Sequence, residues 1–184
     1  VQLLTAPNAP TLPAFPSFAD KAADFTISWT HNPVDTTAQT AYEVEFSTNG
    51  GSSWSTTGKV TSTVSSRVVA ANTYAADAPV TVRVRTWGQA TTGGADGTGA
   101  SPWSTQRTVT FKTRPVATIL TPADASTWDE AELRVGLSFA QAEDGTFVSA
   151  TLQLKQGSTV LETVESTTLA STTFATEVLD GESY

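Results

Sequence analysis

The chain has 184 residues, of which 39% are hydrophobic and 15% are charged, and its formal net charge is −8. This length can bury a core as one large domain or as two domains of roughly 90 residues, and the low charge fraction is typical of β-rich extracellular or assembly proteins. The chain contains no cysteine, which excludes disulfides and thiolate chemistry, and no apolar run long enough to predict a membrane span or a signal peptide.

The first predicted elements are a proline-rich lead-in and a short strand. Residues 3–17 (LLTAPNAPTLPAFPS) contain four prolines, which are too closely spaced for a helix or a central strand. We therefore expect a linker and an edge strand there. In residues 24–30 (DFTISWT), Phe25, Ile27 and Trp29 alternate with polar residues, which predicts a half-buried strand.

A hairpin is the next predicted element. Tyr42, Val44 and Phe46 alternate with two glutamates, and the run Asn-Gly-Gly at positions 49–51 then turns the chain. Alternating runs on both sides of a glycine-containing turn predict a β-hairpin. We interpret this hairpin, which ends at Trp54, as part of the scaffold.

Several further strands complete the first unit. Val68 and Val69 mark a short strand, and residues 79–87 place three valines inward and Arg83, Arg85 and Trp87 outward. A glycine-rich loop over 88–100 precedes the last strand within 101–113. About seven short strands in about 110 residues, without helical periodicity, predict an Ig-like β-sandwich.

The pattern then repeats. Residues 135–139 (VGLSF) match 25–29 (FTISW), residues 150–154 (ATLQL) match 42–46 (YEVEF), and QGSTVL stands where NGGSSW stood. We predict an all-β chain of two tandem sandwiches, 1–114 and 115–184, joined near Arg114 and Pro115.

The second sandwich is predicted to be incomplete, because the counterparts of the last two strands of the first are missing. Either the protein continues past Tyr184 or another chain supplies these strands. We favour continuation, because residues 179–184 (LDGESY) read as the approach to a strand with a corner tyrosine.

With both units laid out, the chain resembles fibronectin type III domains over most of residues 6–113. The resemblance is carried by the segments APTL (9–12), Trp29 followed by Pro33, AYEVEFS (41–47), VTVRVRTW (80–87) and SPWS (101–104). Val80 replaces the corner tyrosine of the family. Phe139 replaces the strand tryptophan in the second unit, which we assign only as Ig-like or type III-like.

Residues 31–54 (HNPVDTTAQTAYEVEFSTNGGSSW) resemble the type III modules of bacteriophage tail proteins, especially those of actinobacteriophages. This resemblance implies a non-enzymatic minor tail or tail-tip protein in the virion, acting as a rigid spacer that docks on other tail subunits in a homo-oligomeric assembly or on a host cell-surface glycan. Two alternatives stay open: an accessory spacer of a secreted bacterial polysaccharide-degrading enzyme, and a bacterial surface adhesin. None of the three needs a cofactor.

Charge limits the partners further. Up to Pro115 the chain has eight Lys and Arg against seven Asp and Glu, and from Val116 onward two against eleven. The acidic second half should repel phosphate backbones, so we do not expect nucleic acid binding. We expect no membrane insertion, because the chain has no apolar run of 18 residues.

Trp87 and Trp103 are the candidate residues for weak carbohydrate or subunit contact, because exposed indoles stack on sugar rings. The competing interpretation, which we favour, places Trp103 beside Arg83 and Arg85 in a cation–π stack. Trp54 corresponds to Leu161 in the repeat, and we expect it to cover a sheet edge.

The other polar candidates have simpler interpretations. His31 is the only histidine, so it builds neither a triad nor a zinc site and is expected to be a loop residue. Two acidic clusters could bind calcium through their carboxylate oxygens or form the carboxylate pair of a glycosidase: Asp129, Glu130 and Glu132, and Glu143 with Asp144. Neither cluster has the spacing of a Ca²⁺-binding loop. We expect both to lie in solvated loops. Residues 93–99 (GGADGTG) lack the lysine of a phosphate loop.

Overall fold

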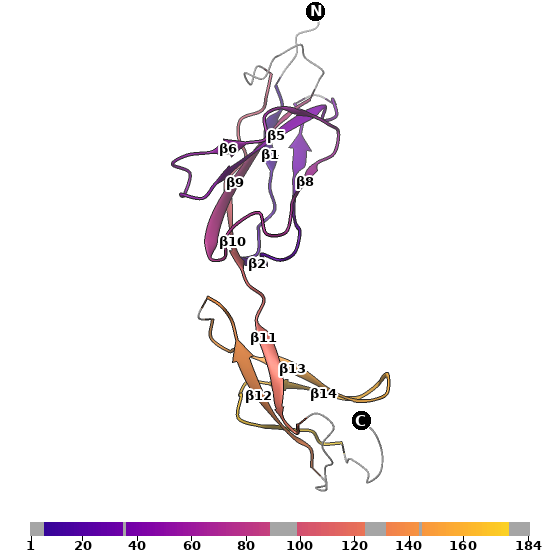
Figure 1. Cartoon of the computed structure of the whole chain (residues 1–184). Coiled ribbons are helices and arrows are strands. Elements are labelled where there is room, and N and C mark those ends of the chain that lie inside the picture. Colours follow the sequence, from indigo (N-terminus) through magenta and orange to yellow (C-terminus); the bar gives the residue numbers. More distant parts are fainter. Residues whose placement is uncertain (1–5, 35, 89–98, 124–131, 144, 177–184) are drawn as a thin grey trace, which may run out of the picture. The chain divides into compact units, whose positions relative to one another are not determined.

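The computed structural model describes residues 6–34, 36–88, 99–123, 132–143 and 145–176, and all regular elements within them are β-strands. The all-β, Ig-like fold class predicted from the sequence is confirmed. The chain divides into two compact units, Val1–Thr113 and Arg114–Tyr184 (Figure 1). The described residues include no helix that could cross a membrane.

The first unit contains ten strands within its described residues. They are β1 (Asn8–Thr11), β2 (Phe18–Asp20), β3 (Phe25–Ser28), β4 (Thr30–Asn32), β5 (Ala41–Ser47), β6 (Ser55–Thr56), β7 (Val60–Thr61), β8 (Ser66–Val69), β9 (Ala78–Trp87) and β10 (Arg107–Lys112).

The larger sheet of the first unit has the order β2-β10-β9-β5-β6, with β7 also paired to β5. Strand β9 lies antiparallel between β5 and β10, while β2 pairs with β10 in parallel. The pairs β3–β8 and β1–β4 form the smaller sheets. The predicted strand over 68–69 and the strand over 79–87 are thereby confirmed.

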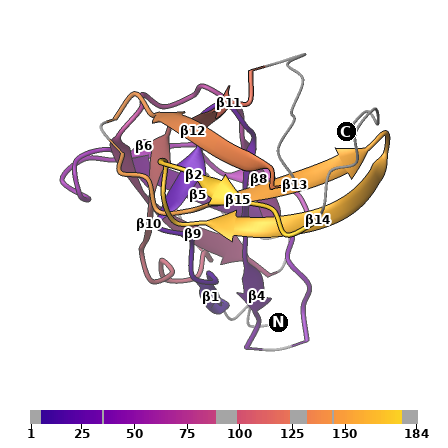
Figure 2. The ribbon, with the colours of Figure 1, turned by 90° about the horizontal axis from the view of Figure 1, so that it is seen from below.

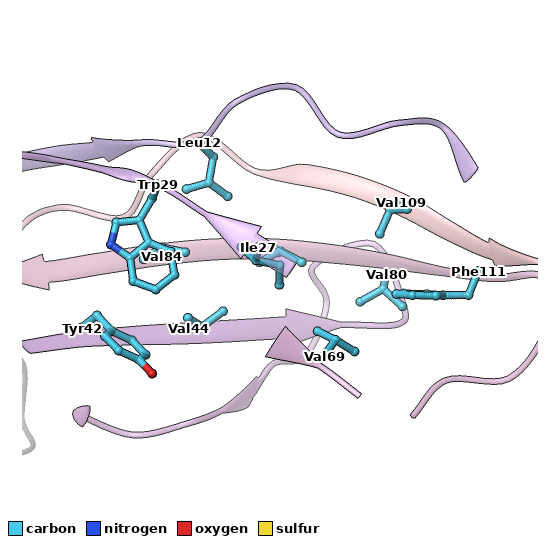
Figure 3. Packing of buried hydrophobic residues seen from close by; sticks show 11 residues of the cluster. Leu12, Ile27, Trp29, Tyr42, Val44, Val69, Val80, Val84, Val109 and Phe111 are labelled. Atoms are coloured by element: carbon cyan, nitrogen blue, oxygen red, sulfur yellow. The ribbon is translucent and has the colours of Figure 1, made fainter. Parts of the chain in front are cut away.

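The core of the first unit is built by the alternating residues that the sequence singled out. In the segment 25–29, Ile27 is 0% exposed and Trp29 is 5% exposed. Val44 of β5 and Val84 of β9 are directly paired across the two strands, and both are 0% exposed. Figure 3 shows these side chains pointing toward one another between the strands. Burial of alternate residues fixes the strand register, because a slip by one residue would expose all of them.

The turn between β5 and β6 has the backbone that its glycines allow. Gly50 and Gly51 have φ values of 68° and 91°, and the Ser47 hydroxyl accepts a hydrogen bond from the Gly51 amide at 2.8 Å. The Asn49 side-chain oxygen accepts another from the Ser53 amide at 2.9 Å. These local bonds close the predicted hairpin.

The two glycines should differ in their tolerance to substitution. Gly51→Ala should lower the free energy of unfolding by roughly 1–2 kcal/mol, because positive φ is costly for alanine and its Cβ would lie 3.2 Å from Trp54 Cζ2. Gly50→Ala is the matched control, since no atom lies within 4 Å of its Cβ position and only the backbone cost applies. Urea unfolding of both variants measures the difference, and equal losses would contradict the steric part of the argument.

The second unit contains five strands within its described residues. They are β11 (Val116–Thr121), β12 (Arg134–Ala140), β13 (Ala150–Gln156), β14 (Thr159–Ser166) and β15 (Thr172–Thr173). Strands β11, β12 and β15 form one sheet, and β13 and β14 form a long hairpin (Figure 2). The antiparallel pairing of β12 with β15 repeats that of β3 with β8, as the internal repeat requires.

A smaller core holds the second unit together. Val135, Leu137, Leu152, Leu154 and Phe174 are each 3–8% exposed and form one cluster. The first four of them alternate within β12 and β13, as predicted. This cluster spans the two sheets of the unit and is the counterpart of the core in Figure 3.

A carboxylate ties the segment after β15 to the β13–β14 hairpin. Glu162 of β14 accepts hydrogen bonds from the backbone amides of Ala175 at 3.0 Å and Thr176 at 2.7 Å. These bonds favour the ionised side chain and lower the pKa of Glu162 below its ordinary value of 4.5.

This contact should weaken at acid pH. Because the pKa of Glu162 is lowered in the folded state, its contribution to stability is present above pH 4.5 and is lost as the pH falls through the depressed value. Hydrogen exchange of the Ala175 and Thr176 amides, corrected for intrinsic rates, should therefore lose protection on acidification. Glu162→Gln should remove the pH dependence, and an unchanged profile in that variant would show that another group is responsible.

Candidate binding face of the first unit

Aromatic and charged side chains alternate on the outer face of β5 and β9. The guanidinium carbon of Arg83 lies 4.1 Å from the ring centroid of Trp54 and 4.6 Å from that of Trp103. The guanidinium carbon of Arg85 lies 4.6 Å from Trp103 and 5.4 Å from Trp87. We call these five residues the Trp–Arg ladder.

The strand register supplies the counter-charges of the ladder. Glu45 is paired with Arg83 across β5 and β9, and Glu43 with Arg85. In each pair the Nη2 atom of the arginine lies 2.6 Å from the Oε2 atom of the glutamate, and Nε donates to the same oxygen. Cross-strand pairs of opposite charge stabilise a sheet, and here both arginines are compensated within the protein.

The segment SPWS positions Trp103 in the ladder. Ser101 and Ser104 donate their backbone amides to the carbonyls of Thr86 and Val84, both at 2.8 Å, and their hydroxyls accept the amides of the same two residues at 3.0 Å. The serine hydroxyls thus take the place of strand carbonyls beside β9. This pairing holds Trp103 against both arginines.

The structure separates the two candidate tryptophans. Trp103 is half-buried, with Arg83 and Arg85 beside its ring. Trp87 is 0% exposed, so the solvent exposure on which its candidacy depended is absent. It lies on the outward face as the alternation required, but Arg85 and Lys59, whose Nζ is 4.9 Å from the ring centroid, cover it.

The position of Trp54 agrees with the interpretation of its hairpin as part of the scaffold. Its side chain is half-buried, and its ring has Arg83 on it and Gly51 beside it. The ladder therefore uses its indoles to hold guanidinium groups, which adds rigidity to the sheet. A role of Trp103 in binding sugar or another subunit stays a prediction.

One buried polar residue of the first unit was not recognised from the sequence. Gln39 is 5% exposed, and its side-chain oxygen accepts a bond from Trp29 Nε1 at 2.8 Å. Its amide nitrogen donates to the carbonyls of Ser62 at 3.1 Å and Val64 at 2.8 Å. The residue ties the core tryptophan to the segment before β8, and only the three-dimensional neighbours reveal this.

The remaining predicted polar residues do not assemble into a site. His31 lies in strand β4, so the expectation that it is a loop residue is wrong, and its Nδ1 atom is 2.9 Å from Thr86 Oγ1. Glu132 lies 3.5 Å from Arg134 at the surface, while Asp129, Glu130 and Asp144 lie outside the described residues. No group of three or more acidic or histidine side chains that could hold a metal occurs in the described part of the chain.

Three solved structures resemble this chain to different extents. The chain is 15% identical to the chicken CNTN1 FN1-FN3 domains, with a TM-score of 0.52, covering 92% of this chain and 57% of that one. An α-L-rhamnosidase from Dictyoglumus thermophilum is 18% identical with a TM-score of 0.44, covering 66% and 16%. A beta-1,2-glucanase from Parabacteroides distasonis is 14% identical with a TM-score of 0.39, covering 58% and 14%.

The sheet order and the buried core of the first unit are those of an Ig-like β-sandwich, and the similarity to the CNTN1 FN1-FN3 domains over 92% of the chain agrees with a fibronectin type III-like fold. More particularly, the chain belongs to the family of Rha78A-like, N-terminal immunoglobulin domains, whose model matches residues 20–112. The match runs from the end of β2 to the end of β10. No curated protein matches the chain.

Proposed function

We propose that this chain is a non-catalytic accessory module of a larger, secreted polysaccharide-degrading enzyme. The observation that carries the proposal is the family match over residues 20–112, because the family is described as an N-terminal domain of Rha78A-like proteins. An N-terminal domain is followed by further parts of its protein, and we place the chemistry there. The chain covers only 14% of the glucanase structure and 16% of the rhamnosidase structure.

The chemistry of the Trp–Arg ladder is consistent with a spacer. The guanidinium groups of Arg83 and Arg85 are each neutralised by a cross-strand glutamate, and the indoles beside them are engaged by these same groups. Arginine and glutamate side chains that bind each other in this way stabilise the sheet, and the groups that form these bonds are already used within the protein. The first unit would thus transmit orientation between neighbouring domains.

Any glycan contact in this role would be weak and shallow. Trp103 is the ladder residue that we propose for it, because it is half-exposed while Trp87 is buried. Weak contacts gain affinity when a catalytic domain on the same polypeptide holds the substrate nearby, since the second contact becomes intramolecular. Trp103→Ala should then reduce retention of the native protein on its polysaccharide without reducing its rate on a short soluble substrate.

The proposal is tested on the protein from its native source. Intact-mass and peptide mass spectrometry should find a catalytic domain in the same polypeptide. The native protein should release reducing sugar from at least one member of a polysaccharide panel, whereas residues 1–184 alone should release none. Hydrolysis by residues 1–184, or a native polypeptide without a hydrolase domain, would overturn the proposal.

A second candidate is a structural protein of a phage tail, and the segment over residues 31–54 favours it through its resemblance to tail modules. In that role the sandwiches would be spacers that dock on other tail subunits or on a host glycan. Co-sedimentation with virions, in fixed stoichiometry to tail proteins, supports this candidate against the enzyme module. Recovery in the cell-wall fraction with an anchoring segment would support the adhesin instead.

A further inference from the structure

The indole groups of the Trp–Arg ladder keep hydrogen-bond donors that the described part of the protein does not use. An indole carries one N–H donor and no acceptor. The indole nitrogens of Trp54 and Trp103 bond to no acceptor among the described residues, and both side chains are partly exposed. By contrast, the indole nitrogen of the core residue Trp29 donates to Gln39 at 2.8 Å. Two ladder donors are therefore available to a ligand.

The two arginines of the ladder keep further donors. Each guanidinium group uses its Nε–Nη2 edge for the glutamate across the strand pair, Arg83 for Glu45 and Arg85 for Glu43. The Nη1 atoms lie outside this edge and bond to no acceptor in the described ranges of the chain. Each Nη1 carries two N–H donors, so the paired arginines can still donate to a second partner.

The exposed fractions show that these donors lie further out than the acceptors of the ladder. The side chain of Arg83 is 24% exposed and that of its partner Glu45 is 15% exposed. In the second pair Arg85 is 20% exposed and Glu43 only 6%. Glu43 also accepts a hydrogen bond from the Thr56 hydroxyl at 2.5 Å. The carboxylates are thus turned toward the protein, and the outer surface of the ladder presents N–H groups.

The strand register places these donors in a row. Arg83 and Arg85 are two residues apart in β9, so they point to the same face of the sheet at a spacing of about 7 Å. The ring centroid of Trp103 lies 4.6 Å from both guanidinium carbons, and that of Trp54 lies 4.1 Å from Arg83. We call Nε1 of the two indoles and Nη1 of the two arginines the donor row.

We propose that the donor row binds carboxylate groups of an acidic polysaccharide, a glycan that contains uronic acid residues. A carboxylate offers two acceptor oxygens in one plane, and hydrogen bonds from a guanidinium group to it are stronger than those to a neutral hydroxyl group. The inference rests on the proposed function, since a polysaccharide is the ligand expected of such an accessory module. It narrows the substrate class from glycans in general to acidic ones.

The charge around the donor row favours this ligand. Up to Pro115 the chain has eight Lys and Arg against seven Asp and Glu, so the first unit does not repel an anionic chain by its net charge. Lys59 adds a cation beyond Arg85, because its Nζ atom lies 4.9 Å from the ring centroid of Trp87. Binding should be measured at about 0.15 M salt, where repulsion from acidic groups more than about 8 Å away is largely screened.

A titration of residues 1–184 with short fragments of polygalacturonate and of alginate tests the proposal. The indole N–H signals of Trp54 and Trp103 in NMR spectra should shift with at least one of the two acids, whereas that of Trp29 should stay in place. Methyl-esterified polygalacturonate fragments keep the sugar chain but lose the charge, and they should bind at least about tenfold more weakly than the acid. No shift with either acid, or equal affinity for the ester or for sulfated dextran fragments, would overturn the proposal.

Substitutions test whether the donors themselves recognise the ligand. Trp103→Phe keeps an aromatic ring but removes one N–H group, and it should weaken binding about tenfold. Arg83→Gln should weaken binding at least as much, whereas Lys112→Gln removes the same charge at the far end of β10 and should have no effect. Circular dichroism checks the fold of each variant, and Trp103→Phe keeps the test decisive if Arg83→Gln unfolds. Equal losses in the two glutamine variants, or unchanged binding by Trp103→Phe, would contradict recognition by the donor row.

This inference and the proposed function fail separately. If residues 1–184 bind neither acid while the native polypeptide contains a hydrolase domain, only the inference is wrong. If they bind an acidic fragment through Trp54 and Trp103 but the native polypeptide has no hydrolase domain, the inference holds and the proposed function is wrong.

Discussion

Trp29→Ala should lower the free energy of unfolding of the first unit by about 4 kcal/mol, within the usual cost of removing a buried aromatic side chain. Trp29 is 5% exposed and lies edge-on to Tyr42, with ring centroids 4.9 Å apart. Its loss leaves a cavity in the core and also removes the indole donor from the buried Gln39 side chain. Both effects act in the same direction.

Chemical unfolding followed by circular dichroism measures this loss without relying on the tryptophan signal. Trp29→Phe is the control, because it keeps much of the aromatic volume and removes mainly the hydrogen bond to Gln39. It should cost about 1–2 kcal/mol. If the alanine variant lost no more stability than the phenylalanine variant, the packing part of the argument would be wrong.

Arg85→Ala should destabilise the first unit by about 3 kcal/mol, because it leaves the Glu43 carboxylate charged and largely buried. The side chains of Glu43 and Arg85 are only 6% and 20% exposed in their ion pair. Arg85 also lies on the rings of Trp87 and Trp103, so the variant loses cation–π contacts in addition.

Two further variants separate these contributions. Lys112→Ala is a matched control, since its partner Asp77 is 64% exposed and such surface pairs contribute at most about 1 kcal/mol. The double variant Glu43→Gln with Arg85→Ala should recover part of the loss, because the buried charge is then removed. The urea midpoints of the Arg85→Ala, Lys112→Ala and double variants measure these contributions. If the double variant recovers no stability, the loss in Arg85→Ala comes entirely from the contacts with the indole rings.

The core of the first unit could be predicted from the sequence because alternation reports directly which residues share a face. Ile27, Val44 and Val84 were identified in this way, and all three are fully buried. Alternation does not report what lies on top of the other face. Glu43 and Trp87 occupy outward positions but are buried. Arg85 lies against both of them, and Lys59 lies over the ring of Trp87.

The supporting polar residues were harder to find for a different reason. Ser101 and Ser104 act through hydroxyl groups that bond to the backbone of β9, and Gln39 bonds to carbonyls more than 20 residues away. Nothing in the local sequence distinguishes Gln39 from a surface residue. The spacing of two serines on either side of Trp103 was the one signal that could have suggested their role.

The parallel pair of β2 and β10 has a mechanical consequence. The amide of Thr110 bonds to the carbonyl of Ser17 at 3.1 Å, and that of Lys21 to the carbonyl of Lys112 at 2.9 Å. When the chain is pulled from both ends of this unit, β2 is drawn toward its start and β10 toward its end. The force then shears these bonds together, whereas an antiparallel hairpin would unzip one bond at a time. The unit should therefore resist stretching without needing a covalent cross-link.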